Sequence, residues 1–261
     1  MDWIYEEIVV ILILAVVQGV TEWLPVSSSG HLVVVQGYFG WKPPLIFDVA
    51  LHVGTLFVVL VAFWEDVLKI LKALVRLDFR AEEGKLALFI LVGSVPTAVM
   101  GFLFHDVFES LFYNVLAVGI ALLINGFFLY VSERRRDSKE LDFLDSLLIG
   151  TAQGIAIVPG VSRSGFTIAT GLMMGVKKEA AFKYSFLLSM PAVVGAAIFE
   201  SRDLVIGGLD MMGLLLGVVT SMVVGYVSLK LLFRMVMRER FHLFAYYCWI
   251  AGATIVVLQL F

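Results

Sequence analysis

Two short polar stretches of this chain contain the side chains best suited to acid–base chemistry and anion binding. Residues 18–31 read QGVTEWLPVSSSGH, and residues 153–166 read QGIAIVPGVSRSGF. Both contain Q-G, six further residues and then V-S-x-S-G. The first copy carries a carboxylate at Glu22 and an imidazole at His31, whereas the second carries a guanidinium at Arg163. The chain therefore repeats one loop and equips the two copies with different functional groups.

The first stretch combines an acid, an imidazole and an anion-binding loop. An ionised carboxylate is costly in hydrocarbon, so Glu22 is expected to face a cavity or a partner, with Gln18 on the same helical face. Three serines, a glycine and the start of a short helix form a typical anion site, where hydroxyls and backbone N–H groups converge. His31 directly follows that loop and can exchange protons near neutral pH. The candidate site residues here are Gln18, Glu22, Ser27, Ser28, Ser29, Gly30 and His31.

The second stretch supplies the positive charge. The planar guanidinium of Arg163 suits a phosphate better than a lysine would, and Ser162, Ser164 and Thr167 add hydroxyl donors. Together the two loops suit a phosphate headgroup, because phosphoryl transfer needs mostly positioning and charge stabilisation. A simpler alternative is an ion pair between Arg163 and Glu22 that only holds the two halves of the chain together.

Two further features bear on the predicted site. A diphosphate usually brings Mg²⁺, which is bound by one or two carboxylates and by phosphate oxygens, so Glu22 is a candidate metal ligand. Asp48 and His52 are four residues apart at the outer end of a predicted span, so they share a helical face. They could line the mouth of the site, although a purely structural role fits the spacing equally well.

The elements that position these residues are predicted to be membrane helices. The chain is 61% hydrophobic and only 16% charged, whereas soluble domains are about 25% charged. Its apolar residues come in blocks of about 20, the length that crosses a bilayer. We therefore expect an all-α polytopic membrane protein with one domain, residues 1–261. The predicted continuous spans are 45–64, 85–104, 110–131, 180–199, 204–233 and 242–261.

The regions 4–40 and 141–176 differ from these spans. Each has an apolar stretch, then the polar loop, then a second apolar stretch too short to cross alone. We interpret each region as a re-entrant helical hairpin, whose loop is tolerated at membrane depth only when it is buried or lines a wet cavity.

The distribution of basic residues predicts the orientation. Three connections are rich in Lys and Arg and are expected to be cytoplasmic: Lys69, Lys72, Arg76, Arg80 and Lys85; Arg134, Arg135, Arg136 and Lys139; Arg234, Arg238 and Arg240. The two halves, about 4–131 and 141–261, then run in opposite directions. The chain is thus predicted to be an inverted-topology repeat of six transmembrane helices and two re-entrant hairpins, with a binding site near the midplane.

At the two loops the sequence resembles the undecaprenyl-diphosphate phosphatase family associated with bacitracin resistance. The first family motif, E/Q-x-x-x-E followed by P-V-S-S-x-G-H, appears as QGVTEWLPVSSSGH. The second, P-G-x-S-R-S-G-x-T, appears as PGVSRSGFT, and FDVALHVGT at 47–55 is also similar. The likeness extends over nearly the whole chain.

The resemblance implies an integral membrane phosphatase. Such an enzyme hydrolyses undecaprenyl diphosphate, or another polyprenyl diphosphate, to the monophosphate and phosphate, and so recycles the lipid carrier for cell-wall glycan synthesis. It would act in the plasma membrane, with its active site on the outer side and with a divalent cation, Mg²⁺ or Ca²⁺. Glu22 would bind metal or exchange protons, Ser28 and His31 would form the nucleophile or base pair, and Arg163 would hold phosphate. Contacts to phosphate oxygens would come from Ser27, Ser162, Ser164 and Thr167.

Two other functions fit parts of the sequence. An inverted repeat is common in secondary transporters, so a transporter or flippase of lipid phosphate or another anion is the second hypothesis. His31 argues against it, because anion binding alone needs no imidazole. A structural membrane protein is the third hypothesis. We expect a lipid partner and no nucleic acid, and the stretch GATIVV (252–257) could pack between the subunits of a homodimer or within one chain.

Overall fold

The protein is an assembly of α-helices, as expected. The computed structural model describes residues 2–40, 45–112, 114–133, 139–200 and 211–260. The helices of these ranges are α1 (Asp2–Thr21), α2 (Ser28–Phe39), α3 (Leu45–Ala62), α4 (Trp64–Val75), α5 (Glu82–Leu103), α6 (His105–Phe112), α7 (Val115–Ser132), α8 (Phe143–Ile155), α9 (Arg163–Met173), α10 (Lys178–Glu200), α11 (Met211–Met237) and α12 (Leu243–Leu260). The predicted all-α fold class is confirmed.

Each of the six predicted spans contains a long apolar helix. Among the described residues, five helices can cross a membrane by length and composition, namely α5, α7, α10, α11 and α12. Helices α3 and α4 meet the same criterion only as a pair, with a bend of 84° between them. The described part of the chain thus holds five or six candidate spans. This confirms a polytopic membrane protein.

Helix α4 was not predicted from the sequence. The predicted span 45–64 is interrupted near its end, and the chain bends sharply into α4, which occupies part of the basic connection. Ile70 and Ala73 are three residues apart and are both buried, so they turn one face of α4 toward the protein. Asp66 of α4 also pairs with Lys183 of α10 at 2.5 Å. The basic connection, which was expected to be a loop, therefore contains the amphipathic helix α4.

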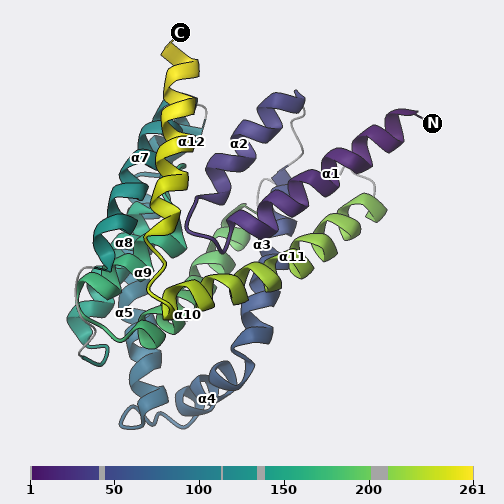
Figure 1. Cartoon of the computed structure of the whole chain (residues 1–261). Coiled ribbons are helices and arrows are strands. Elements are labelled where there is room, and N and C mark those ends of the chain that lie inside the picture. The colour runs from purple at the N-terminus through teal and green to yellow at the C-terminus, as the bar shows by residue number, and fades with distance from the viewer. Residues whose placement is uncertain (1, 41–44, 113, 134–138, 201–210, 261) are drawn as a thin grey trace.

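The contacts between helices follow the pairing expected of two related halves. In Figure 1, α1 lies along α11, and α7 lies along α12. Helix α8, the counterpart of α1, packs in the same way against α5, the counterpart of α11. Helix α3 likewise contacts its own counterpart, α10. Each hairpin is therefore held by the opposite half of the chain, while the direction in which each half enters the membrane stays a prediction.

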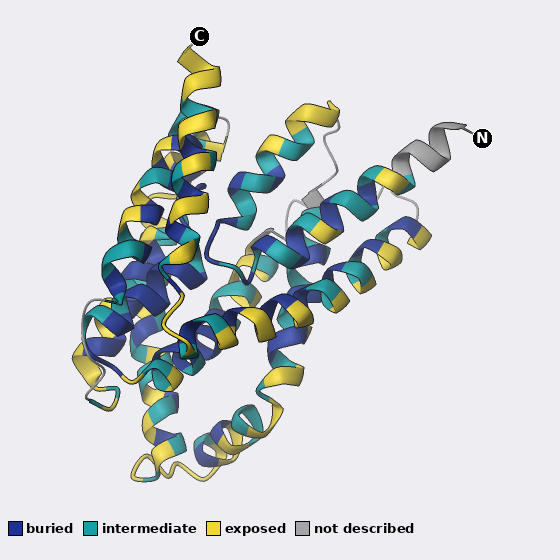
Figure 2. Cartoon of the chain, in the orientation of Figure 1, coloured by how far each residue is buried: buried dark blue, intermediate teal, exposed yellow. Residues whose placement is uncertain are grey.

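Buried residues gather where the two hairpin loops meet the central helices. Figure 2 shows this buried region in the middle of the molecule, with exposed residues toward the outer faces and ends. The largest buried apolar cluster includes Trp23 of the first loop, Val118 and Leu122 of α7, and Phe186 of α10. The polar loops are therefore embedded in an apolar core that fixes their positions.

The small-residue stretch 252–257 begins at a contact inside the chain. A Cβ atom built on Gly252 would lie 2.7 Å from the carbonyl oxygen of Gly119, so the backbones of α12 and α7 approach closely there. Gly252, the first residue of the stretch that could pack between subunits, therefore already packs against α7 of the same chain. A homodimer stays a prediction, and no surface is assigned to it.

Replacement of Gly150 by alanine is expected to destabilise the fold. A Cβ atom on Gly150 of α8 would lie 2.0 Å from the carbonyl oxygen of Gly93 of α5, and neither backbone can move without separating the two helices. We expect a loss of about 2–4 kcal/mol in unfolding free energy, the range of severe overpacking. Thermal unfolding in detergent measures it.

Gly195→Ala is the matched control for this change. Gly195 also lies in a helix, α10, but no atom lies within 4 Å of the corresponding Cβ position. The control is expected to be neutral or slightly stabilising, because alanine favours helix more than glycine does. An equal loss of stability in both variants would contradict the close contact between α8 and α5.

Candidate active site

The two repeated loops form equivalent helix starts. Ser27 caps α2, and its Oγ accepts a hydrogen bond from the N–H of Gly30 at 3.3 Å. Ser162 caps α9 in the same way, with its Oγ 3.2 Å from the nitrogen of Gly165. Serine is a favoured N-cap because its hydroxyl satisfies an N–H group that has no partner within the helix. The sequence V-S-x-S-G thus produces the same capping hydrogen bond twice, although the backbone differs, with φ at 70° for Ser27 and −86° for Ser162.

Hydrogen bonds join the two loops directly. Ser27 Oγ also accepts from the backbone N–H of Gly160 at 3.0 Å. In the other direction, the hydroxyl of Ser164 donates to the carbonyl oxygen of Trp23 at 3.0 Å. Each loop therefore satisfies a backbone group of the other, and both are fixed in one relative position.

Asn125 of α7 also joins the two loops, and it was not predicted from the sequence. Its Nδ2 donates to the carbonyl oxygen of Pro25 at 2.9 Å, and its Oδ1 accepts from the N–H of Ser162 at 3.1 Å. One buried amide thus binds both loops. The signal was present in the sequence, because an asparagine inside an apolar span needs polar partners.

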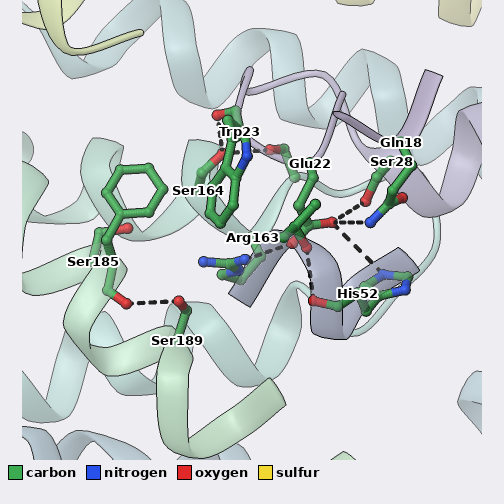
Figure 3. Close-up of polar contacts among 12 residues, drawn as sticks. Gln18, Glu22, Trp23, Ser28, His52, Arg163, Ser164, Ser185 and Ser189 are labelled. Atoms are coloured by element: carbon green, nitrogen blue, oxygen red, sulfur yellow. Dashed lines mark hydrogen bonds and ion pairs between the residues drawn. The ribbon is translucent and has the colours of Figure 1, made fainter. Parts of the chain in front are cut away.

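Glu22 lies at the centre of the site, as Figure 3 shows. Its Oε1 is 2.6 Å from Nη2 of Arg163, which comes from the opposite loop. Its Oε2 accepts from the hydroxyl of Ser28 at 2.7 Å and from Nε2 of Gln18 at 3.2 Å. The predicted meeting of the carboxylate with the guanidinium is present, and Gln18 shares the helical face of Glu22.

His52 is the imidazole beside Glu22. Its Nε2 is 3.7 Å from Oε2 of Glu22, and its Nδ1 is 2.8 Å from the carbonyl oxygen of Asp48. A carbonyl only accepts, so Nδ1 carries a hydrogen and Nε2 faces the carboxylate. The carboxylate of Asp48 instead accepts from Gln36 at 3.1 Å. Of the two residues expected at the mouth, His52 contacts Glu22, and the side chain of Asp48 is bound to Gln36.

His31 is turned toward α12. Its Nδ1 is 2.7 Å from the carbonyl oxygen of Ser27, and its Nε2 is 2.6 Å from the hydroxyl of Tyr247. Both ring nitrogens are therefore engaged by groups other than Glu22 and Arg163. The sequence did not indicate Tyr247, because no motif connects it to the loops.

Burial separates the remaining candidates into two groups. Ser27, Ser162, Ser164 and Thr167 are buried, and the hydroxyl of Thr167 lies 2.5 Å from that of Ser185. The hydroxyls of Ser162 and Ser164 are 3.2 Å apart. Gly30 is also buried, and a Cβ atom built on it would lie 3.3 Å from the α-carbon of Gly160. A partly exposed set remains for contact with a ligand: Glu22, Ser28, Ser29, His31, His52 and Arg163.

Replacement of His52 by leucine is expected to lower kcat/KM about tenfold, the effect of removing one polar contact to a charged group. The imidazole lies 3.7 Å from Oε2 of Glu22, and leucine offers no polar atom in its place. Steady-state kinetics measure the effect. His105→Leu is the control, because His105 of α6 packs against the ring of Phe199 of α10. Equal activity in both variants would show that His52 has no part in the site.

The chain is similar to a family of known proteins over almost its whole length. The family model described as Bacitracin resistance protein BacA matches residues 11–254. The undecaprenyl-diphosphatase of Halothermothrix orenii is 42% identical over 260 residues, which cover 97% of this chain and 98% of the relative. That of Methanosphaera stadtmanae is 40% identical, covering 95% and 96%. That of Korarchaeum cryptofilum is 41% identical, covering 97% and 99%.

Proposed function

The chain belongs to the bacitracin resistance protein BacA family, and on this premise we propose that the loops around Glu22 are the active site of a membrane phosphatase. The reaction is hydrolysis of undecaprenyl diphosphate to undecaprenyl phosphate and phosphate, which recycles the lipid carrier for cell-wall glycan synthesis. The observation that carries the proposal is the contact of Glu22 with Arg163, which joins an acid–base group to a phosphate-binding group across the two loops.

Arg163 is the proposed phosphate-binding residue. Its Nη2 is held by Glu22, whereas Nη1 is buried and has no hydrogen-bond partner. A buried donor without a partner is unfavourable, and an incoming phosphate oxygen would satisfy it. The guanidinium can therefore engage the terminal phosphate while it remains next to Glu22.

Ser28 is the proposed nucleophile, and Glu22 its base. The hydroxyl of Ser28 already donates to Oε2 of Glu22 at 2.7 Å, which is the geometry needed for proton removal. The Ser28 oxygen would bond to the terminal phosphorus while its proton passes to Glu22. The bond from that phosphorus to the bridging oxygen would break, and undecaprenyl phosphate would leave. Water would then hydrolyse the phosphoserine and release phosphate.

We include a divalent cation, Mg²⁺ or Ca²⁺, in this proposal. The carboxylate of Glu22 and Oε1 of Gln18, which is buried without a partner, are oxygen ligands of the kind these ions take. Among the described residues no three His, Cys, Asp or Glu side chains gather, so phosphate oxygens and water would complete the coordination. The ion would neutralise charge on the phosphate. Chelation followed by return of either ion, with phosphate release as the readout, tests it.

The direct test uses purified protein and undecaprenyl diphosphate in detergent. We expect release of one phosphate and formation of undecaprenyl phosphate, identified by mass spectrometry. The transporter hypothesis instead expects movement of lipid phosphate across liposomes with no hydrolysis. The relatives named above are diphosphatases, which favours hydrolysis over transport.

We further propose that the protein lies in the plasma membrane and that its site opens to the outer side. Basic residues favour the cytoplasmic side, and α4 carries Lys69 and Lys72, whereas α6 carries no Lys or Arg. The one cysteine, Cys248, is buried, so it should give little background labelling.

Cysteines placed on α6 and α4 test this orientation. We expect Glu109→Cys to react with a membrane-impermeant maleimide in intact cells and Lys72→Cys to react only after lysis, since both positions are exposed. The reverse pattern would place the site on the cytoplasmic side. Equal labelling of both before lysis would indicate leaky cells, which a cytoplasmic marker protein detects.

A further inference from the structure

Helix α4 has an apolar side that faces away from the protein. Its inner side centres on Ile70, which packs in one buried cluster with Ala87 of α5. On another side, Trp64, Leu71 and Val75 are 56%, 51% and 86% exposed. These three residues are seven and four positions apart, so they form one row along the helix, which we call the apolar stripe. Such a row marks a surface that is covered by something other than water.

A basic row runs beside the apolar stripe. Lys69, Lys72 and the C-cap residue Arg76 are exposed and are three and four positions apart, so they share one side of α4. Lys72 and Arg76 each directly follow a residue of the apolar stripe, which places this basic stripe about 100° around the helix from it. The two acids of α4, Glu65 and Asp66, lie in the first turn. The later turns of α4 therefore present an apolar side and a positive side next to each other.

The position of α4 in the fold brings both stripes to a membrane surface. The apolar helix α3 leads into α4 through a bend of 84°, and α5, a candidate span, begins at Glu82 soon after α4 ends. In Figure 1, α4 runs across the bottom of the molecule between these two helices. A helix that joins the ends of two membrane helices, nearly at right angles to one of them, lies close to the plane of the bilayer surface. In interfacial amphipathic helices of this kind, the apolar side meets acyl chains and the basic side meets anionic headgroups.

A pocket at the bend extends the apolar stripe onto α3. It is open and apolar, and it is lined by Phe57, Leu60, Val61 and Trp64. Trp64 and Lys69 are about 8 Å apart along the helix axis, so an acyl chain in the pocket and the phosphate of the same lipid can reach both. Tryptophan is also typical of the level of the headgroups. The pocket therefore offers a place for one chain of a lipid bound at the basic stripe.

We propose that the apolar and basic stripes of α4 form a binding site for anionic phospholipids. The ammonium and guanidinium groups of the basic stripe bind headgroup phosphate, and the acyl chains cover the apolar stripe. Each Lys or Arg near an anionic membrane surface strengthens binding about fivefold, so three of them give a clear preference over neutral lipid. The inference goes beyond the proposed reaction and does not depend on it, and neither of its tests measures turnover.

The first test measures the depth of two adjacent residues of α4. Leu71→Cys and Lys72→Cys each carry a nitroxide spin label, in protein reconstituted into vesicles of phosphatidylcholine and phosphatidylglycerol in equal parts. Cys248 is buried, so it should take up little label. We expect the label at position 71 to be relaxed mainly by oxygen, which dissolves among acyl chains. The label at position 72 is expected to be relaxed mainly by a water-soluble nickel chelate.

The second test measures lipid preference by native mass spectrometry of delipidated protein titrated with phosphatidylglycerol or phosphatidylcholine. The α4 variant combines Lys69→Gln, Lys72→Gln and Arg76→Gln. The control removes the same charge from other exposed positions and combines Arg234→Gln, Arg238→Gln and Arg240→Gln. We expect the wild type to bind phosphatidylglycerol with an apparent Kd at least about tenfold below that of phosphatidylcholine. The α4 variant is expected to retain a preference of about twofold or less, and the control to stay within about twofold of the wild type.

The two tests together decide the inference. It is supported when the two labels differ as expected and the α4 variant alone loses its preference for phosphatidylglycerol. Equal relaxation of both labels by the nickel chelate would place α4 in water and overturn it. Protection of the label at position 71 from both reagents would show that a protein covers the apolar stripe, which also overturns it. The absence of a preference in the wild type, or an equal loss in both variants, would leave only a general effect of charge and reject a site on α4.

Discussion

Arg163→Lys is expected to lower kcat/KM for undecaprenyl diphosphate about 1,000-fold, the effect of losing a main donor to the developing charge. In the structure Nη2 binds Glu22 while Nη1 is left for the phosphate. Lysine keeps the positive charge but offers one compact ammonium in place of a planar fork. It can stay with the carboxylate or move to the phosphate, and it cannot make both contacts in the same geometry. Steady-state assays of phosphate release measure the loss.

Two controls separate this effect from loss of the fold. Arg234→Lys changes an exposed arginine in the last turn of α11 and is expected to leave kcat/KM unchanged. Thermal unfolding of Arg163→Lys is expected within a few degrees of the wild type, since the ion pair with Glu22 can persist. Retention of activity within tenfold, or a loss explained by unfolding, would support the simpler alternative in which Arg163 and Glu22 only hold the two halves together.

The meeting of Glu22 and Arg163 was predictable because it follows from a repeat in the sequence. The two loops have the same pattern of serine and glycine, so each forms a capped helix start. Related halves pack around a common centre, and that brings the loops together although they lie far apart along the chain. The helices were predictable for a similar reason, since apolar blocks of span length have few alternative structures in a membrane.

The directions of side chains within the site were not predictable in this way. His31 follows the serines in the sequence, yet its ring bonds to Tyr247, and it is His52 that approaches Glu22. These directions depend on how α2, α3 and α12 dock against each other, which a sequence pattern does not encode. Asn125 shows the opposite case, because a buried amide in an apolar helix was a readable signal of a polar partner.

Ser28→Ala is expected to reduce kcat at least about 10,000-fold, because it removes the nucleophile itself and not only a contact to it. The matched comparison is Ser29→Ala, which removes a hydroxyl from the next residue of the same turn. Ser29 Oγ lies 3.3 Å from Ser27 Oγ, whereas Ser28 Oγ bonds to Glu22. We therefore expect a loss of about tenfold or less for Ser29→Ala.

Trapping of the intermediate distinguishes a serine nucleophile from an activated water. Rapid acid quenching of the wild-type reaction should yield a phosphorylated peptide that contains Ser28, and Ser28→Ala should yield none. Turnover by Ser28→Ala within about 100-fold of the wild type, with no phosphopeptide from either protein, would transfer the role of nucleophile to water. Glu22 would keep its role as base in that case, because it lies next to Ser28 and both residues are partly exposed. The outcome for Ser28 thus decides whether the nucleophile is a serine or a water molecule. The outcome for Arg163 decides whether this is the phosphate site at all.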